Sequence, residues 1–403
     1  MMENIVPVLR RHRRRRGKKD SGFVQLFISK RLIHGAAAAL LGIFVPIFIY
    51  ETTGEQFYIV GGYYALLSAL YALFIVPGMK VANRVGFSRT LVIGGACSVI
   101  LYSVFYFMTE DNFWYLLPFL TIVITAFRIF HWVPFHVDFA LFTKEGERGR
   151  QVSLSFATVA FMGVIGPILA GFIIENAGYD TLFAVAVVLL IAATISYGFV
   201  PETRTKFTWT YKKTLQKMLS KDYRGVVVGE AANGVEIATT TIVWPIFLYE
   251  ILDGDVFEIG AISTVIVAVT IVLQLVVGNY IDKMSSHKHK TLRWGTFLTA
   301  LGWIFKIFVL SAAQVFFVGL YHNIVKIFLK TPFSAILYDM SAEQGKYIDE
   351  FTVLREMSTH IARALALTAT AVATLYIPIG WTFVLAAAAS IAINMVYQNR
   401  KIG

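Results

Sequence analysis

The chain repeats its own hydrophobic sequence at a spacing of about 199 residues. Residues 45–51 read VPIFIYE, and residues 244–250 read WPIFLYE. Further along each copy, RIFHWVPF at 128–135 matches KIFLKTPF at 326–333. The sequence therefore predicts two related halves. Such a repeat is typical of secondary transporters, whose substrate site lies between the halves.

The hydrophobic runs are long enough to cross a membrane. Of 403 residues, 57% are hydrophobic and 15% are charged, whereas about a quarter of the residues in soluble domains are charged. About 20 apolar residues span the hydrocarbon layer as a helix, which predicts an all-α membrane protein. We expect twelve spans, over residues 24–50, 57–78, 90–108, 113–140, 152–174, 180–200, 225–250, 257–280, 292–310, 313–338, 352–376 and 379–397.

Charged residues alternate between the segments that connect these spans. The connections on one side are acidic and contain no Lys or Arg, whereas those on the other side and both ends of the chain are basic. Since Lys and Arg are retained in the cytoplasm, we expect a multi-pass protein with both termini cytoplasmic, in a prokaryotic plasma membrane. The predicted parts are a basic N-terminus (1–23), a first half (24–200), a cytoplasmic linker (201–224) and a second half (225–403).

Two basic segments need an interpretation of their own. The run RRHRRRR at 10–16 fits a topological role and contact with anionic lipid, so no nucleic acid is expected as a partner. Residues 207–219 place apolar side chains on one helical face and lysines elsewhere. This pattern predicts either a short helix on the inner membrane surface or a solvated connection.

Several chemistries are excluded by the residues present. Cys97 is the single cysteine, which excludes a disulfide framework and a multi-cysteine metal site. The chain contains no G-x-x-x-x-G-K-[ST], H-E-x-x-H or G-x-S-x-G motif. We therefore expect no enzyme, no metal and no cofactor.

Several local motifs resemble those of the major facilitator superfamily. Residues 278–283 (GNYIDK) are similar to the G-x-x-x-D-R/K loop of that family, and residues 79–86 (MKVANRVG) are a weaker copy. Arg128 matches the arginine of the family's fourth helix, and Gly166-Pro167 resembles its fifth-helix motif. The resemblance implies twelve transmembrane helices in two pseudo-symmetric six-helix bundles, with the first, fourth, seventh and tenth helices lining a central cavity.

Ionisable residues in these cavity-lining spans are the candidate substrate site, because charges inside a membrane are costly and mark function. Arg128 and Lys326 are repeat mates near the middle of the bilayer, and they predict a site for a carboxylate or phosphate. The alternative is that protein carboxylates neutralise both cations. The substrate-binding candidates are Arg128, His131, Lys326, Lys330, His34 and Asn233.

Carboxylates of the seventh span are the candidate proton carriers, because a carboxylate in a dry cavity can take up a proton near neutral pH. Glu236 is the first choice and Glu230 the second. A static salt bridge from Glu236 to Lys326 or Arg128 is the alternative. Lys306, in the ninth span, is expected to reach toward the outer surface or to pair with a neighbour.

The resemblance also implies a lock between the halves at the cytoplasmic ends. In such a lock each loop of the second-to-third-helix type packs against the opposite half. Glu356, His360 and Arg363 share a stripe of the eleventh span, which favours a gate or structural network over substrate contact. The gating candidates are Arg84, Asp138, Arg150, Asp282, Lys283, Asp339, Asp349, Glu350 and Glu356.

The function predicted from these features is secondary active transport by alternating access. We expect coupling to a proton or another ion and a small solute that carries an anionic group. One alternative is an efflux antiporter for drugs or metabolites. An alternative of another class is a sensor or scaffold with a transporter fold that moves nothing. The expected partners are the solute, the coupling ion and membrane lipid, with the chain acting as a monomer.

Overall fold

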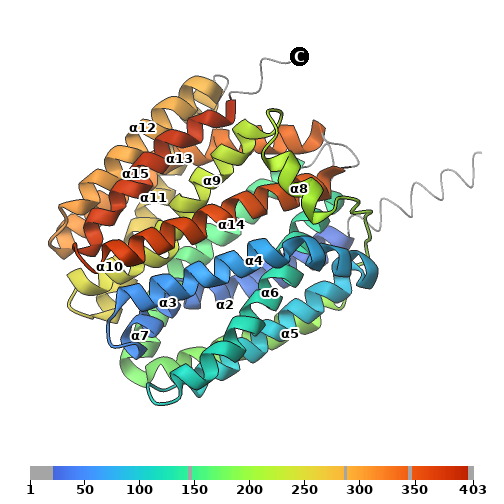
Figure 1. Cartoon of the computed structure of the whole chain (residues 1–403). Helices are drawn as coiled ribbons and strands as arrows, with labels where there is room; N and C mark the ends of the chain where they lie inside the picture. The colour runs from blue at the N-terminus through green and yellow to red at the C-terminus, as the bar shows by residue number, and fades with distance from the viewer. Residues whose placement is uncertain (1–20, 144–147, 286–287, 344–346, 398–403) are drawn as a thin grey trace, which may run out of the picture.

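The computed structural model of the chain describes residues 21–143, 148–285, 288–343 and 347–397. These residues form helices joined by short connections, and no strand occurs among them. Figure 1 shows the helices in two bundles that run roughly parallel, with the blue-to-green half below and the yellow-to-red half above. The expectation of an all-α protein built from two bundles is confirmed.

The first bundle begins with a helix that is interrupted twice. A π-helical segment, η1, leads into α2, and Gly42-Ile43 separates α2 from α3. The last element of this bundle, α7, consists of two helices. They are separated at Gly178, whose φ of 76° and ψ of 170° lie outside the helical region. The elements are η1 Phe27–Ile33, α2 His34–Leu41, α3 Phe44–Thr52, α4 Phe57–Val85, α5 Phe87–Tyr106, α6 Phe113–Phe142 and α7 Arg148–Tyr197.

The second bundle repeats this plan. Its first helix also contains a π-helical segment, η2, and Pro245 stands at the start of α10, where a missing N–H costs little. The elements are α9 Arg224–Ala238, η2 Thr239–Val243, α10 Trp244–Ile251, α11 Val256–Ser285, α12 Lys288–Ile307, α13 Ala312–Glu343, α14 Ile348–Ala373, η4 Ile379–Thr382, α15 Phe383–Ala392 and η5 Ile393–Tyr397.

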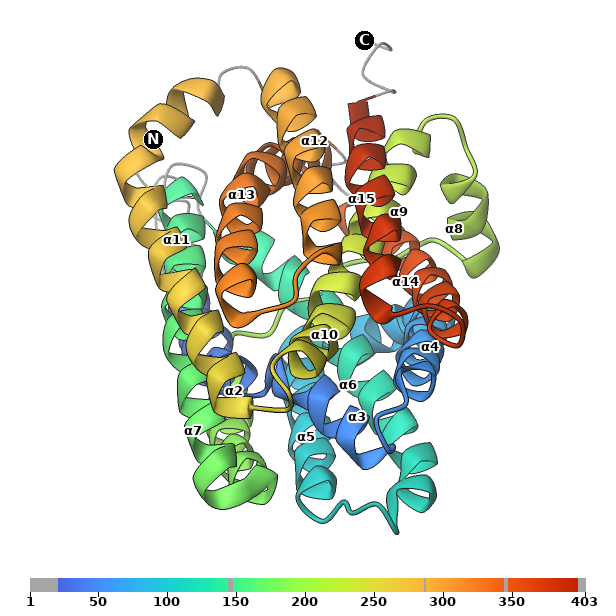
Figure 2. The same ribbon diagram turned by 90° about the vertical axis from the view of Figure 1, so that its left-hand side faces the viewer.

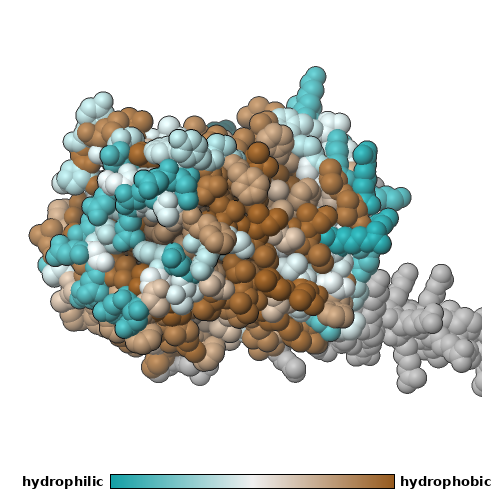
Figure 3. Space-filling model, turned by 90° about the horizontal axis from the view of Figure 1, so that it is seen from below, coloured by the Kyte–Doolittle hydropathy of each residue, from teal (hydrophilic) through white to brown (hydrophobic). Residues whose placement is uncertain are grey.

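Nine of the described helical segments are long and apolar enough to cross a membrane. One of them, Ala157–Tyr197, contains the break at Gly178 and so includes two expected spans. The expected ninth and eleventh spans correspond to α12 and α14, which carry more charge. Figure 3 shows hydrophobic side chains over the middle of one face and hydrophilic ones gathered toward its ends. This distribution fits a multi-pass membrane protein.

The two bundles pack on each other along two helix pairs, α4 with α14 and α7 with α11. The second pair approaches closely because small residues stand at the contact. A Cβ atom added at Gly260 would lie 2.4 Å from the carbonyl oxygen of Pro167, and one added at Gly171 would lie 2.7 Å from that of Val256. At these two glycines the backbones of the two halves therefore approach each other with no side chain between them.

At one end of the molecule, which we call the α3–α10 end, the two halves meet directly (Figure 2). The hydroxyl of Tyr50 donates a hydrogen bond of 2.8 Å to Glu250, and that of Tyr249 reaches Glu55 at 3.4 Å. The rings of Tyr50 and Tyr249 lie edge to face, 5.9 Å apart. The repeated Tyr-Glu pairs of the sequence thus close this end against each other.

The linker crosses the opposite end, which we call the linker end, and ends in a short helix, α8 (Tyr211–Met218). Thr210 caps this helix by accepting a hydrogen bond from the backbone N–H of Lys213. Phe207, Tyr211 and Met218 pack against an apolar cluster of α4, α6 and α14. The short helix is present, and these three apolar side chains cover the protein, whereas Leu215 of the same helix is exposed. Its position at the inner membrane surface stays a prediction.

Candidate substrate and coupling site

Arg128 lies in the middle of α6, among tyrosine side chains. Its guanidinium interacts electrostatically with three tyrosines of α4 and with Tyr102 of α5. The Nη1 atom is buried and has no hydrogen-bond partner. No carboxylate of the described residues forms an ion pair with Arg128. A cation in the middle of a span is thus held without a counter-ion.

Two predicted histidines stack on each other on one side of α6. The rings of His34 and His131 are nearly parallel, with centroids 4.7 Å apart. Both side chains are buried, and neither ring nitrogen of His131 has a hydrogen-bond partner. One turn earlier in the first helix, Lys30 Nζ lies 4.5 Å from the ring of Trp132. The first half therefore supplies cationic and imidazole groups but no carboxylate at this place among the described residues.

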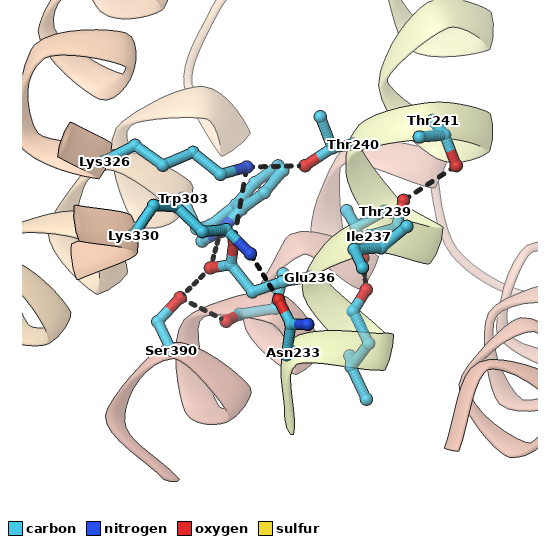
Figure 4. Close-up of polar contacts among 12 residues, drawn as sticks. Asn233, Glu236, Ile237, Thr239, Thr240, Thr241, Trp303, Lys326, Lys330 and Ser390 are labelled. Carbon is cyan, nitrogen blue, oxygen red and sulfur yellow. Dashed lines mark hydrogen bonds and ion pairs between the residues drawn. The ribbon is translucent and has the colours of Figure 1, made fainter. Parts of the chain in front are cut away.

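The second half differs, because its lysine has a resident carboxylate (Figure 4). Lys326 Nζ lies 3.3 Å from Glu236 Oε2 and donates a hydrogen bond of 2.9 Å to Thr240. Glu236 is fully buried and also accepts hydrogen bonds from Trp303 Nε1, at 2.7 Å, and from the hydroxyl of Ser390. The expected alternative, a salt bridge from Glu236 to Lys326, is present in this conformation.

A second ion pair lies nearly two turns earlier in α9, toward the linker end. Arg355 Nε of α14 lies 2.5 Å from Glu230, which also accepts hydrogen bonds from Thr359 and Asn233. The oxygen of Asn233 in turn accepts a hydrogen bond from Lys330. The structure therefore brings together three of the candidate residues, Asn233, Glu230 and Lys330.

The expectation that Lys306 reaches the outer surface is wrong, because its side chain is buried. Its side chain is 3% exposed, and Nζ lies 3.7 Å from the ring centroid of Trp244 and 4.3 Å from that of Trp303. The cation is held between two aromatic faces, an arrangement that replaces part of its lost hydration. Lys306 thus belongs to the core around Glu236.

The predicted gating carboxylates are bonded to threonines of the linker. Asp138 accepts a hydrogen bond from the Thr203 hydroxyl, and Glu350 accepts 2.8 Å bonds from both the N–H and the hydroxyl of Thr208. Both carboxylates are fully buried, whereas Arg84 is exposed. Asp349 is buried beside Glu350. The side chains of Arg150, Asp282, Lys283 and Asp339 lie outside the described residues.

Comparison with known proteins identifies the fold. The family model of the Major Facilitator Superfamily matches residues 31–228. The chain is a member of the major facilitator superfamily. Two POT structures, a mutant peptide transporter with alafosfalin and a POT family transporter with 5-aminolevulinic acid, each have TM-score 0.67, 11% identity and 95% coverage of both chains. The peptide transporter POT in complex with sulfate has TM-score 0.67, 11% identity and 93% coverage of both chains. No curated protein matches the sequence.

As a member of this family, the chain is a secondary transporter and not an enzyme. Its helices α2, α6, α9 and α13 correspond to the cavity-lining spans expected from the resemblance. These helices carry the cations and carboxylates described above. Among the described residues, no group of three His, Cys, Asp or Glu side chains could hold a metal ion.

Sequence reasoning missed several partners of this facilitator's charged residues. Trp303 and Ser390 bind Glu236 from helices that are remote in sequence, and no motif marks them. The linker threonines were missed as well. Thr203 and Thr205 alternate, a spacing that puts both on one side of an extended segment and could have predicted their contacts with Asp138 and Asn83. Thr208, which binds Glu350, does not follow this alternation.

Proposed function

We propose that the chain is a proton-coupled transporter for a small solute that carries an anionic group. The observation that supports this is Arg128, a guanidinium inside a span with no carboxylate partner among the described residues. An uncompensated charge at this depth costs several kcal/mol, on the order of what protein sites recover by pairing. A substrate carboxylate or phosphate would supply the missing partner, bound bidentately.

Lys326 has a different role in this proposal, because Glu236 already neutralises it. Protonation of Glu236 would remove the negative charge and release Lys326 Nζ from the ion pair 3.3 Å away. Glu230 and Arg355 would provide a second such pair nearer the linker end. A change of partners at these sites is a physical means by which proton uptake alters the packing of α13 and α14 against α9.

The solved relatives agree with an anionic group, although they share the fold alone at 11% identity. Their ligands are alafosfalin, 5-aminolevulinic acid and sulfate. We propose the orientation given by the basic connections, with both termini and the linker cytoplasmic and the chain a monomer in a prokaryotic plasma membrane. The α3–α10 end is then the outer end, and it is closed here.

The test uses sulfate as the probe anion and purified full-length protein. We expect Arg128→Gln to abolish the sulfate-dependent rise in unfolding temperature and Arg128→Lys to weaken it, since Lys offers a point charge without the bidentate geometry. Arg89→Gln is the matched control, because the Arg89 side chain is 73% exposed at the surface. Equal sulfate affinity in Arg128→Gln and the wild-type protein would remove Arg128 from the site and contradict the proposal.

A further inference from the structure

We propose that Arg363 of α14 is a second anion ligand, facing Arg128 across the two halves, and that Glu356 is the resident counter-ion that the substrate displaces. This inference rests on the proposed function and goes further by naming the ligand class. Arg128 and Arg363 come from different bundles, and their guanidinium groups interact electrostatically. Tyr64 and Tyr71 of α4 interact electrostatically with both arginines, which places the pair at one location.

Unsatisfied polar atoms gather at this location. Arg128 Nη1 and Arg363 Nε are both buried without a hydrogen-bond partner. Like Arg128, Arg363 forms no ion pair with a carboxylate of the described part of the chain. Buried donors are nearly always paired in stable structures, so one unpaired donor on each of the two arginines indicates a missing acceptor.

Glu356 is the carboxylate that interacts electrostatically with Arg363, and it makes only long contacts. It accepts a 3.3 Å hydrogen bond from Tyr71, and its Oε2 lies 3.9 Å from His360 Nε2. Its side chain remains 25% accessible although it lies well inside α14. The groups that interact electrostatically with Glu356 are Tyr71 of α4, Glu230 of α9, and Arg355 and Arg363 of α14.

Charge balance and the geometry of the two guanidinium groups together identify the ligand class. Two guanidinium groups and one carboxylate leave one positive charge, so a monoanion neutralises the site while Glu356 stays ionised. A dianion neutralises it only when Glu356 takes up one proton and becomes a neutral acid. Each guanidinium fork binds two oxygens side by side, a pair that a planar carboxylate offers on one edge, whereas a tetrahedral oxyanion offers a different edge to each arginine. The ligand class is therefore a dianionic phosphate or phosphonate group, bound together with one proton.

The only bond that changes in this step is an O–H bond. The substrate's oxygens accept hydrogen bonds from Arg128 and Arg363, and the Glu356 carboxylate binds one hydronium proton from the bulk solvent, which leaves a neutral water molecule. Because the two arginines stand on α6 and α14, one bound anion would draw the halves together. Without the anion, the two like charges on opposite halves repel. Substrate and proton would thus favour the same closed arrangement, as coupled transport requires.

The experiment measures sulfate binding and proton uptake on the full chain in detergent, because sulfate stays dianionic at mildly acidic and mildly alkaline pH. For the wild-type protein we expect tighter binding at the lower pH and uptake of about one proton per sulfate at the higher pH. Arg363→Gln should weaken sulfate binding about tenfold or more, and should affect acetate binding less. Glu356→Gln should bind sulfate with no pH dependence and no proton uptake.

The outcomes separate this inference from the proposed function. If Arg128→Gln abolishes sulfate binding while Arg363→Gln leaves it unchanged, Arg363 is not a ligand and the inference fails alone. If proton uptake persists in Glu356→Gln, the counter-ion exchange is wrong. If Arg363→Gln does not fold, Arg363→Lys replaces it, with the same expected loss of preference for sulfate over acetate. Arg89→Gln serves again as the control that keeps wild-type binding and proton uptake.

Discussion

At the scale of single residues, the Glu236 cluster shows that the buried charges of the second half depend on one another. Glu236→Gln keeps an oxygen for Trp303 but leaves Lys326 without its counter-ion. We expect a loss of about 3 kcal/mol in the free energy of unfolding, as is typical when one partner of a buried pair is removed. Denaturant unfolding of the purified protein, followed by tryptophan fluorescence, measures the loss.

The double variant Glu236→Gln/Lys326→Met provides the control for this prediction. It removes both charges and keeps the side-chain volumes similar, so it should recover most of the stability that the single variant loses. A double variant as unstable as Glu236→Gln alone would show that the ion pair is not the source of the loss. In that case the hydrogen bonds of Ser390 and Trp303 would be responsible.

The depth of each candidate residue in its span was predictable from the sequence, because helical spacing alone determines it. Arg128 and Lys326 fall in the middle of their spans by simple counting, and the repeat connects them. Spacing could not predict that Glu236 would form an ion pair with Lys326, which leaves Arg128 without a carboxylate partner among the described residues. That outcome depends on how far each helix is rotated about its axis, and neighbours remote in sequence determine this rotation. The burial of Lys306 between two tryptophans has the same cause.

At the scale of helices, the contact between α7 and α11 is set by glycine. A methyl group at Gly260 would meet the carbonyl oxygen of Pro167 at 2.4 Å, so the backbones must separate. We expect Gly260→Ala to cost about 2 kcal/mol of stability, the usual effect of overpacking, and to slow transport because this contact joins the halves. Thermal unfolding and a transport assay in proteoliposomes measure the two effects.

Gly62→Ala is the matched control for this helix contact. It lies on α4, and no atom lies within 4 Å of the added methyl group. Alanine there should be neutral or stabilise the protein by about 0.5 kcal/mol through the unfolded state. A loss of stability in Gly62→Ala equal to that in Gly260→Ala would mean that the close approach to Pro167 is not the source of the loss.

The helices themselves were largely predictable, because apolar length and the charged connections define them. The break at Gly178 falls between the expected spans 152–174 and 180–200, where a residue with positive φ separates the two parts of α7. The linker was predictable only in part. Its lysine and aromatic spacing predicts the helix α8, but the apolar side of that helix has two possible partners, lipid and protein. The packing of Phe207 and Tyr211 on the apolar cluster at the linker end shows that the protein covers part of that side.

At the scale of the whole molecule, the repeat explains why one end is closed. The same Tyr-Glu pair occurs once in each half, and the copies meet at the α3–α10 end, where Tyr50 donates to Glu250. A hydrogen bond to a carboxylate contributes about 1.5–3 kcal/mol, so its loss should raise the population open at this end about tenfold or more. We therefore expect Tyr50→Phe to shift the protein toward the conformation that is open at the α3–α10 end.

Spin labels on repeat mates measure this shift directly. Tyr58→Cys and Phe257→Cys place one label at the first turn of α4 and one at the first turn of α11, in a Cys97→Ser background that leaves no other thiol. In Tyr50→Phe the distribution of label distances should gain a longer component, whereas Tyr115→Phe, at a residue 85% exposed, should not change it. An unchanged distribution in Tyr50→Phe would mean that the packing of α3 on α10 closes this end without help from the tyrosine. Rocking of the halves would then have to begin in that helix contact.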